Sequence, residues 1–102
     1  MVDSIEINIK SGINSKYISL FDFKNNLCII NDKRIMIDDN MKSSLLRIIR
    51  TWKNNYGTSN IIDAEEFLIT VISNNIIETI QGKGNYPNNY DELLEFLGDL
   101  YA

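Results

Sequence analysis

The sequence predicts an α+β fold with a mainly antiparallel sheet, in the element order ββββ-α-ββ-α. The first third of the chain alternates between apolar and polar residues with a period of two, which is typical of strands. Two later segments repeat apolar residues every three or four positions, which is typical of amphipathic helices. Because the connections between the first four strands are short, those strands must be antiparallel. We expect the two helices to lie together on one face of the sheet.

Four short strands are predicted before residue 38. The first alternates Ile5, Ile7 and Ile9 with polar residues, so that one side of the strand is apolar. The strands are expected at residues 5–10, 17–23, 27–30 and 34–37, with turns at residues 11–15, 24–26 and 31–33. Asparagine recurs in these turns, and it adopts a positive φ more readily than most residues. The four strands therefore form a meander.

The first helix is predicted to begin after Asp38 or Asp39, because a carboxylate accepts hydrogen bonds from the free N–H groups of a first turn. Its apolar stripe consists of Met41, Leu45, Ile48, Ile49, Trp52 and Tyr56. Its exposed side is basic and consists of Lys42, Arg47, Arg50 and Lys53. Gly57 stands where a residue ending the helix is expected. Trp52, lying on the stripe, is predicted to be part of the core rather than of a nucleic-acid surface.

Two further strands and a second helix are predicted in the C-terminal half. The strands are expected at residues 67–72 and 76–80, and the loop from Gly82 to Asn89 (residues 82–89) follows them. Asn88 or Asn89 is expected to cap the helix, with Glu92 completing a capping box. The apolar side of this helix consists of Leu93, Leu94, Phe96, Leu97, Leu100 and Tyr101. Its exposed side is acidic and consists of Asp91, Glu92, Glu95 and Asp99.

Composition limits the function classes. No repeat or linker divides the chain, so residues 1–102 are predicted to form a single domain. The net charge of −4 disfavours a nucleic-acid partner. No apolar run is long enough to span a bilayer and the first residues do not form a signal peptide, so we expect no membrane partner and a cytoplasmic location. The 18 isoleucines and 14 asparagines indicate a low-GC bacterium or its phage.

The residue types also limit the chemistry. The chain has no histidine and one cysteine, which excludes histidine-based catalysis, metal sites built on imidazole or paired thiolates, and an internal disulfide. We therefore predict that the protein is not an enzyme, with no catalytic residues, no cofactor and no metal ligands. Cys28 lies between apolar residues of a strand, so it is predicted to be a small buried hydrophobe whose thiol pKa is raised.

Two weaker site hypotheses concern glycines and carboxylates. Gly82, Lys83 and Gly84 precede a helix, whose N-terminus can bind an anion, but their spacing matches neither a phosphate loop nor a dinucleotide loop. A strand-to-helix connection is the simpler interpretation. Acidic pairs or clusters occur at Asp38 with Asp39 and at Asp63, Glu65 and Glu66. They lack the alternating ligands and central glycine of a calcium loop, so helix caps and strand edges account for them.

Some strands are apolar on both faces, notably those at residues 27–30 and 67–72. Two short helices can cover only one face of a sheet of five or six strands. Two alternatives follow and remain open here. Either an apolar face stays exposed and serves as an interface, for example in a homodimer, or the sheet curls enough to bury it.

Three segments carry a resemblance to known proteins. They are residues 82–92 (GKGNYPNNYDE), residues 52–56 (WKNNY) and residues 63–67 (DAEEF). This pattern is similar to small uncharacterised proteins of low-GC bacteria, some of the kind found beside polymorphic toxins as candidate immunity proteins. The resemblance covers the C-terminal half of the chain. It implies a binding protein and assigns no functional residue.

The leading hypothesis is a non-enzymatic protein-binding module, in its most specific form an immunity or antitoxin-like protein that sequesters a basic partner such as a toxin domain. Its partner-binding residues would be Asp91, Glu92, Glu95 and Asp99, which can steer a basic protein electrostatically. One alternative is a small anion- or ligand-binding domain or enzyme that uses the loop from Gly82 to Asn89. Another is a dimerising scaffold or phage accessory protein.

Overall fold

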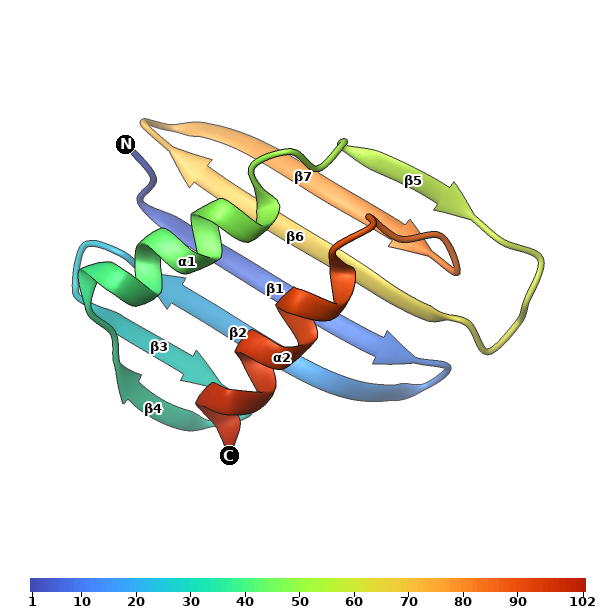
Figure 1. Cartoon of the computed structure of the whole chain (residues 1–102), viewed down its shortest axis with the longest axis horizontal. Helices are drawn as coiled ribbons and strands as arrows, with labels where there is room; N and C mark the ends of the chain where they lie inside the picture. Colours follow the sequence, from blue (N-terminus) through green and yellow to red (C-terminus); the bar gives the residue numbers. More distant parts are fainter.

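The computed structural model describes residues 1–102 and consists of a seven-stranded sheet with two helices packed against it (Figure 1). The elements are β1 (Ser4–Ser11), β2 (Asn14–Asp22), β3 (Leu27–Ile30), β4 (Lys33–Met36), α1 (Asp39–Ile49), β5 (Asn55–Thr58), β6 (Glu65–Ser73), β7 (Ile76–Lys83) and α2 (Tyr90–Tyr101). The predicted α+β class with a mainly antiparallel sheet is confirmed. The predicted order is wrong in one respect, because three strands rather than two separate the helices.

The strand order across the sheet is β4-β3-β2-β1-β6-β7-β5, with β1 at the centre. β1 pairs antiparallel with β2 on one side and with β6 on the other. Only β5 is parallel to its neighbour, β7. The β1–β6 ladder runs from the pair Ser4 and Ile72 to the pair Ser11 and Glu65, so it joins the N-terminal meander to the C-terminal hairpin.

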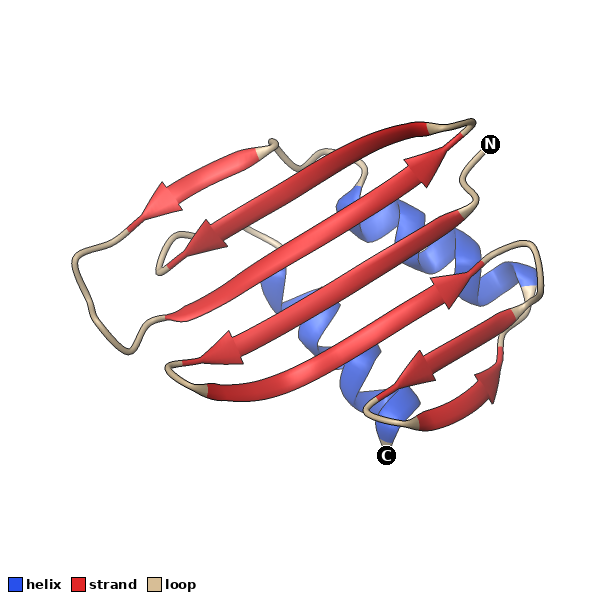
Figure 2. Cartoon of the chain, turned by 180° about the vertical axis from the view of Figure 1, so that it is seen from behind, coloured by secondary structure: helices blue, strands red, loops and turns tan.

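Both helices lie on the same face of the sheet. They stand in front of it in Figure 1 and behind it in Figure 2. No helix of the chain is long and apolar enough to cross a membrane. The opposite face carries no other element of the chain, and we call it the open face.

The core lies between the sheet and the helices. β1 shows the pattern most simply, because Ile5, Ile7 and Ile9 are at most 1% exposed while the residues between them face the other way. The other fully buried side chains come from both the sheet and the two helices. They are Phe21, Cys28, Ile30, Leu45, Phe67, Ile69, Leu93 and Leu97. The alternation read from the sequence therefore identified the inner face of the central strand correctly.

Asparagine adopts a positive φ in three of the tight turns, and this was predicted for those at residues 24–26 and 31–33. Asn26, Asn31, Asn74 and Asn75 all have φ between 46° and 68°, a region that asparagine tolerates better than β-branched residues. The first turn is tighter than the predicted residues 11–15, because the pairing of β1 with β2 continues to Ser11 and Asn14 after an irregularity at Ile9.

The start of α1 is as predicted, but its end is not. The Asp38 side chain accepts a hydrogen bond from the Met41 N–H at 2.9 Å, which makes Asp38 the N-cap. The helix ends at Ile49, well before Gly57. The Trp52 N–H donates to the Ile49 carbonyl at 3.0 Å, and this turn directs the indole into the core, where it is 8% exposed.

The residues after Trp52 form β5 instead of a last helical turn. The Gln81 N–H donates to the Asn54 carbonyl at 3.0 Å, and this bond holds the segment against the edge of β7. Tyr56, predicted to lie on the helical stripe, therefore packs from a strand, with its ring 6.1 Å from that of Phe67. Pairing with an available sheet edge satisfies more backbone groups than a frayed helix end exposed to water.

Asn89 joins the end of α1 to the start of α2, and this role corrects the predicted capping box. Its Oδ1 accepts a hydrogen bond from the Trp52 indole at 2.6 Å, and its Nδ2 donates to the Ile48 carbonyl at 2.9 Å. Asn89 still stands at the N-cap position of α2, but its side chain bonds none of the helix N–H groups. Glu92 forms no capping box and pairs with Arg47 instead.

We expect Asn89→Ala to lower the free energy of unfolding by about 2–3 kcal/mol, because it leaves the indole N–H and a helical carbonyl without partners in a partly buried site. Urea denaturation followed by circular dichroism measures this change. Asn88→Ala is the matched control, since Asn88 is exposed and its loss should cost no more than about 0.5 kcal/mol. Equal effects of the two substitutions would contradict the role of Asn89.

Burial raises the pKa of the Cys28 thiol to about 11. The pKa of a thiol in an unfolded chain is about 8.5. The contribution of Cys28 to the free energy of unfolding is therefore fully present below that pH and is lost as the pH rises towards 11. Between these values we expect the free energy of unfolding to fall more steeply for the natural chain than for Cys28→Ala. Urea titrations at several pH values measure both slopes, and parallel slopes would show that the thiol ionises equally in both states.

Candidate functional site

The acidic residues predicted on the last helix lie together on the outer side of α2. Tyr90, Leu93 and Leu97 anchor this helix to the core, and all three are buried. Asp91, Glu92, Glu95 and Asp99 are all exposed, and we call these four residues the acidic ridge. The predicted apolar side is right for most of its members, but Tyr101 is 45% exposed at the end of the helix.

Only one member of the acidic ridge forms an ion pair. Arg47 Nη1 of α1 lies 3.1 Å from Glu92 Oε2, with both side chains about half exposed. A pair this exposed contributes little, typically about 0.2–1 kcal/mol. The opposite charges of the two helices therefore meet at one point. Asp91, Glu95 and Asp99 form no ion pair within the chain.

These three unpaired carboxylates stand four residues apart along α2, so each is a neighbour of the next on the helix surface. Like charges at this spacing destabilise a helix by about 0.2–0.5 kcal/mol per pair. Asp99 also lies near the C-terminus of the helix, where the macrodipole disfavours negative charge. Asp91 lies in the first turn, where the macrodipole favours a carboxylate, so the repulsion along the row is offset at that end and not at Asp99.

Glu65 and Glu66, of the acidic cluster singled out before β6, have structural partners. Glu65 Oε2 accepts a hydrogen bond from the Tyr90 hydroxyl at 2.7 Å, and Glu65 Oε1 lies 3.3 Å from Lys16 Nζ. Glu66 pairs with Lys10 at 3.1 Å. Asp63 is exposed in the loop before β6. No three carboxylate or thiol groups gather closely enough to hold a metal ion.

An aromatic cluster that the sequence analysis did not identify surrounds Phe67. The ring centroids of Trp52, Tyr56, Tyr86 and Tyr90 lie 5.3–6.2 Å from that of Phe67. Tyr86 and Tyr90 are stacked at 4.6 Å. Burial, and next the hydrogen bond to Glu65, raises the pKa of Tyr90. The four-residue spacings of Trp52 with Tyr56 and of Tyr86 with Tyr90 are the only sequence signals of the cluster.

The loop considered as an anion site in the sequence analysis is shorter than the predicted residues 82–89. Gly82 and Lys83 belong to β7, so the loop begins only at Gly84. The Gly84 N–H donates to the Glu65 carbonyl at 3.1 Å, and the Tyr90 N–H donates to the Pro87 carbonyl at 3.1 Å. The Tyr90 and Glu92 N–H groups, two of the donors at the start of α2, are therefore used within the chain, the second by the Asn89 carbonyl. The simpler interpretation, a strand-to-helix connection, describes this geometry better.

The open face is mixed in chemistry and keeps part of its apolar surface in water. Of the two alternatives for the second face, the structure shows the exposed one: Ile18 is 57% exposed, Met36 70%, Leu68 39% and Ile77 66%. Other aliphatic side chains on this face are half-buried between their neighbours, and these are Leu20, Leu27, Ile29 and Ile72. Aliphatic groups thus lie over five of the seven strands.

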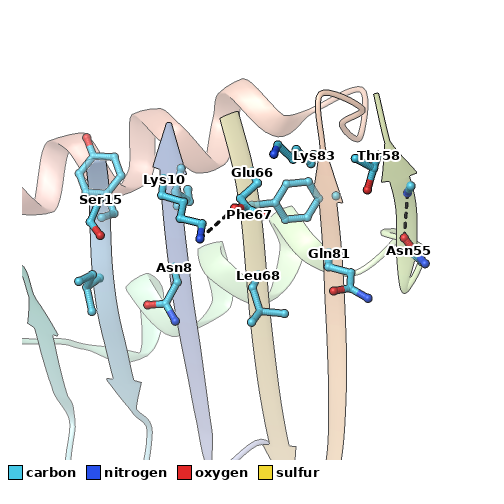
Figure 3. Close-up of a pocket in the computed structure, with 15 residues that line it drawn as sticks. Asn8, Lys10, Ser15, Asn55, Thr58, Glu66, Phe67, Leu68, Gln81 and Lys83 are labelled. Atoms are coloured by element: carbon cyan, nitrogen blue, oxygen red, sulfur yellow. Dashed lines mark hydrogen bonds and ion pairs between the residues drawn. The ribbon is translucent and has the colours of Figure 1, made fainter. Parts of the chain in front are cut away.

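A hollow of about 600 Å³ occupies one end of the open face. Its floor includes a row formed by Asn8 of β1, Leu68 of β6 and Gln81 of β7, as Figure 3 shows. The Lys10–Glu66 pair and Lys83 border it. A second hollow of about 500 Å³ lies beside β2 and shares Asn8 and Ile18 with the first.

Comparison with known protein families, with curated proteins and with solved structures finds no match to this chain. The acidic ridge and the open face are the two surfaces whose chemistry indicates a function, because each brings together several groups that have no partner within the chain.

We expect Gly82→Ala to destabilise the fold by about 1–3 kcal/mol, as overpacked cores do. A Cβ at Gly82 would lie 2.6 Å from the Asn85 carbonyl oxygen and 2.8 Å from Phe67 Cε1. Gly98→Ala is the control. A Cβ there meets only Tyr17 Oη at 3.4 Å, so alanine should stabilise α2 by about 0.5–1 kcal/mol. Thermal denaturation measures both changes, and a neutral Gly82→Ala would show that the aromatic cluster is loosely packed.

Proposed function

We propose that this chain is a non-enzymatic protein-binding module of the immunity or antitoxin type, which sequesters a basic protein partner. The observation that carries the proposal is the row of three unpaired carboxylates on the outer side of α2. Asp91, Glu95 and Asp99 repel one another and make no ion pair in the chain. A basic partner would offset this repulsion when it binds, so the unpaired row favours the complex over the free protein.

Electrostatics explains how such a partner would be captured. The chain has a net charge of −4, and the acidic ridge concentrates four of its carboxylates on one helix. A concentrated charge of one sign accelerates the encounter with a protein of the opposite sign, by about 10- to 1,000-fold at low salt. The Arg47–Glu92 pair marks one side of this surface, so the partner's cations would dock on the side facing away from α1.

The resemblance noted for the C-terminal half supports the same class, because it implies a binding protein and some of the similar proteins are of the kind found beside polymorphic toxins. Products of genes adjacent to the gene for this chain are therefore the first candidates for the partner. A basic protein that forms a complex with the purified chain is the probe for the following test.

We expect Glu95→Lys combined with Asp99→Lys to slow association with that basic partner by about tenfold at low salt, with a weaker dependence on salt concentration. The substitutions leave the buried side of α2 unchanged, so the melting temperature should stay equal or rise slightly. Stopped-flow measurement of the association rate at several salt concentrations provides the readout.

The control is Asp63→Lys combined with Glu78→Lys, which changes the net charge equally at two exposed positions away from α2. If both double variants slow association equally, net charge rather than the acidic ridge governs binding. If neither changes the rate or its salt dependence, the proposal that the ridge binds the partner is wrong.

A further inference from the structure

The open face has the dimensions of an interface between two proteins. The molecule measures 39 × 29 × 22 Å, and the sheet lies across the two longer dimensions (Figure 1). A face of this extent is of the same order as the area of about 800 Å² that each partner contributes to a stable complex. The helices cover the opposite face only, so an area of this size stays in water in the isolated chain.

The two ends of the open face differ in net charge. One end carries Lys10 and Lys83, with Glu66 between them on the sheet, and has a net charge of +1. The other end carries Glu6 of β1, Asp22 of β2 and Arg34 of β4, and has a net charge of −1. The face as a whole is nearly balanced, so it does not suit the strongly basic partner proposed for the acidic ridge.

A surface whose two ends have opposite net charge is complementary to itself when one copy is reversed. A two-fold axis that crosses the strands between Glu6 and Asn8 produces this reversal. In the register of the sheet, Leu20 lies beside Glu6 and Ile18 lies beside Asn8. The axis therefore places Leu20 of one copy against Ile18 of the other, and it sets the end that carries Lys10 against the end that carries Asp22.

The aliphatic side chains and the hollows fit the same arrangement. Ile18 borders both hollows and is more than half exposed, so it can fill space on a facing surface. Aligned packing of two sheets keeps the strands within about 30° of one another and interleaves the side chains of the facing surfaces. We propose that the open face binds a second copy of this chain, forming a two-fold symmetric dimer in which the two sheets pack face to face and the helices lie outside.

The mass of the natural chain in solution tests this directly. Sedimentation equilibrium over a wide range of concentrations should show a species of twice 11.8 kDa. Ile18→Lys combined with Leu68→Lys should raise the dissociation constant of this dimer at least tenfold, because it buries four like charges per dimer on the shared surface. The matched control is Ile13→Lys combined with Ile62→Lys, at residues that are 99% and 85% exposed outside the sheet, and it should leave the dimer unchanged.

A measurement on the natural chain makes the test independent of how the variants fold. On dilution, methyl NMR signals of Ile18, Ile29 and Leu68 should shift together, while those of Ile13 and Ile62 should not. A monomer at every concentration overturns the proposal. So does a dimer whose shifting signals lie on the helices and not on the open face.

The dimer and the acidic ridge can be tested separately. The ridge lies on the helical side of the molecule, so Glu95→Lys combined with Asp99→Lys should leave the mass in solution unchanged. A failure of the dimer proposal would therefore leave the proposed binding of a basic partner standing, and the reverse also holds.

Discussion

The pairing of β1 with β6 is the interaction on which the rest of the structure depends. The β1–β6 ladder is the only strand pairing that joins the two halves of the chain, because every other pairing lies within the N-terminal meander or within the C-terminal strands. The two sides of β1 also differ in polarity, because Ile5, Ile7 and Ile9 point to the helices while Glu6, Asn8 and Lys10 point to the open face. A slip of one residue in this ladder would exchange the two sets, so the alternation of β1 fixes the register of the whole sheet.

The register of β1 decides which face of the sheet the two helices cover and which face stays open. They have 11 and 12 residues, each about 17 Å long at 1.5 Å per residue, and both are needed to cover the inner face of seven strands. Asn89 fixes their relative position by binding the indole of Trp52 and the carbonyl of Ile48. The outer sides of the helices and the open face are then the surfaces available to partners, and they differ in charge: one is strongly acidic and the other is balanced.

The sequence predicted those features whose causes are local. Asp38 caps α1 because of its position before an amphipathic segment, the turn asparagines adopt positive φ, and Cys28 is buried because its strand is apolar on both sides. β5 was missed because Asn55–Thr58 has no alternation, and only the free edge of β7 makes it a strand. The role of Asn89 depends on Trp52, which lies far away in the sequence, so its neighbours indicated an ordinary cap. The four residues of the acidic ridge were placed on one exposed helix side correctly, because that placement follows from helical periodicity alone.

The position of β1 in the sheet has a consequence for synthesis on the ribosome. β1 is synthesised well before its partner β6, which is complete only at Ser73. Until then, the meander can form, and it exposes along β1 an unpaired edge rich in isoleucine, which is the kind of edge that recruits other chains. Because the ladder that closes this edge is highly non-local, its formation is also slow compared with that of the local hairpins. β1 is thus the central strand of the folded protein but an exposed edge strand of the nascent chain. The chain is therefore most prone to pair with other chains in the interval before β6 emerges from the ribosome.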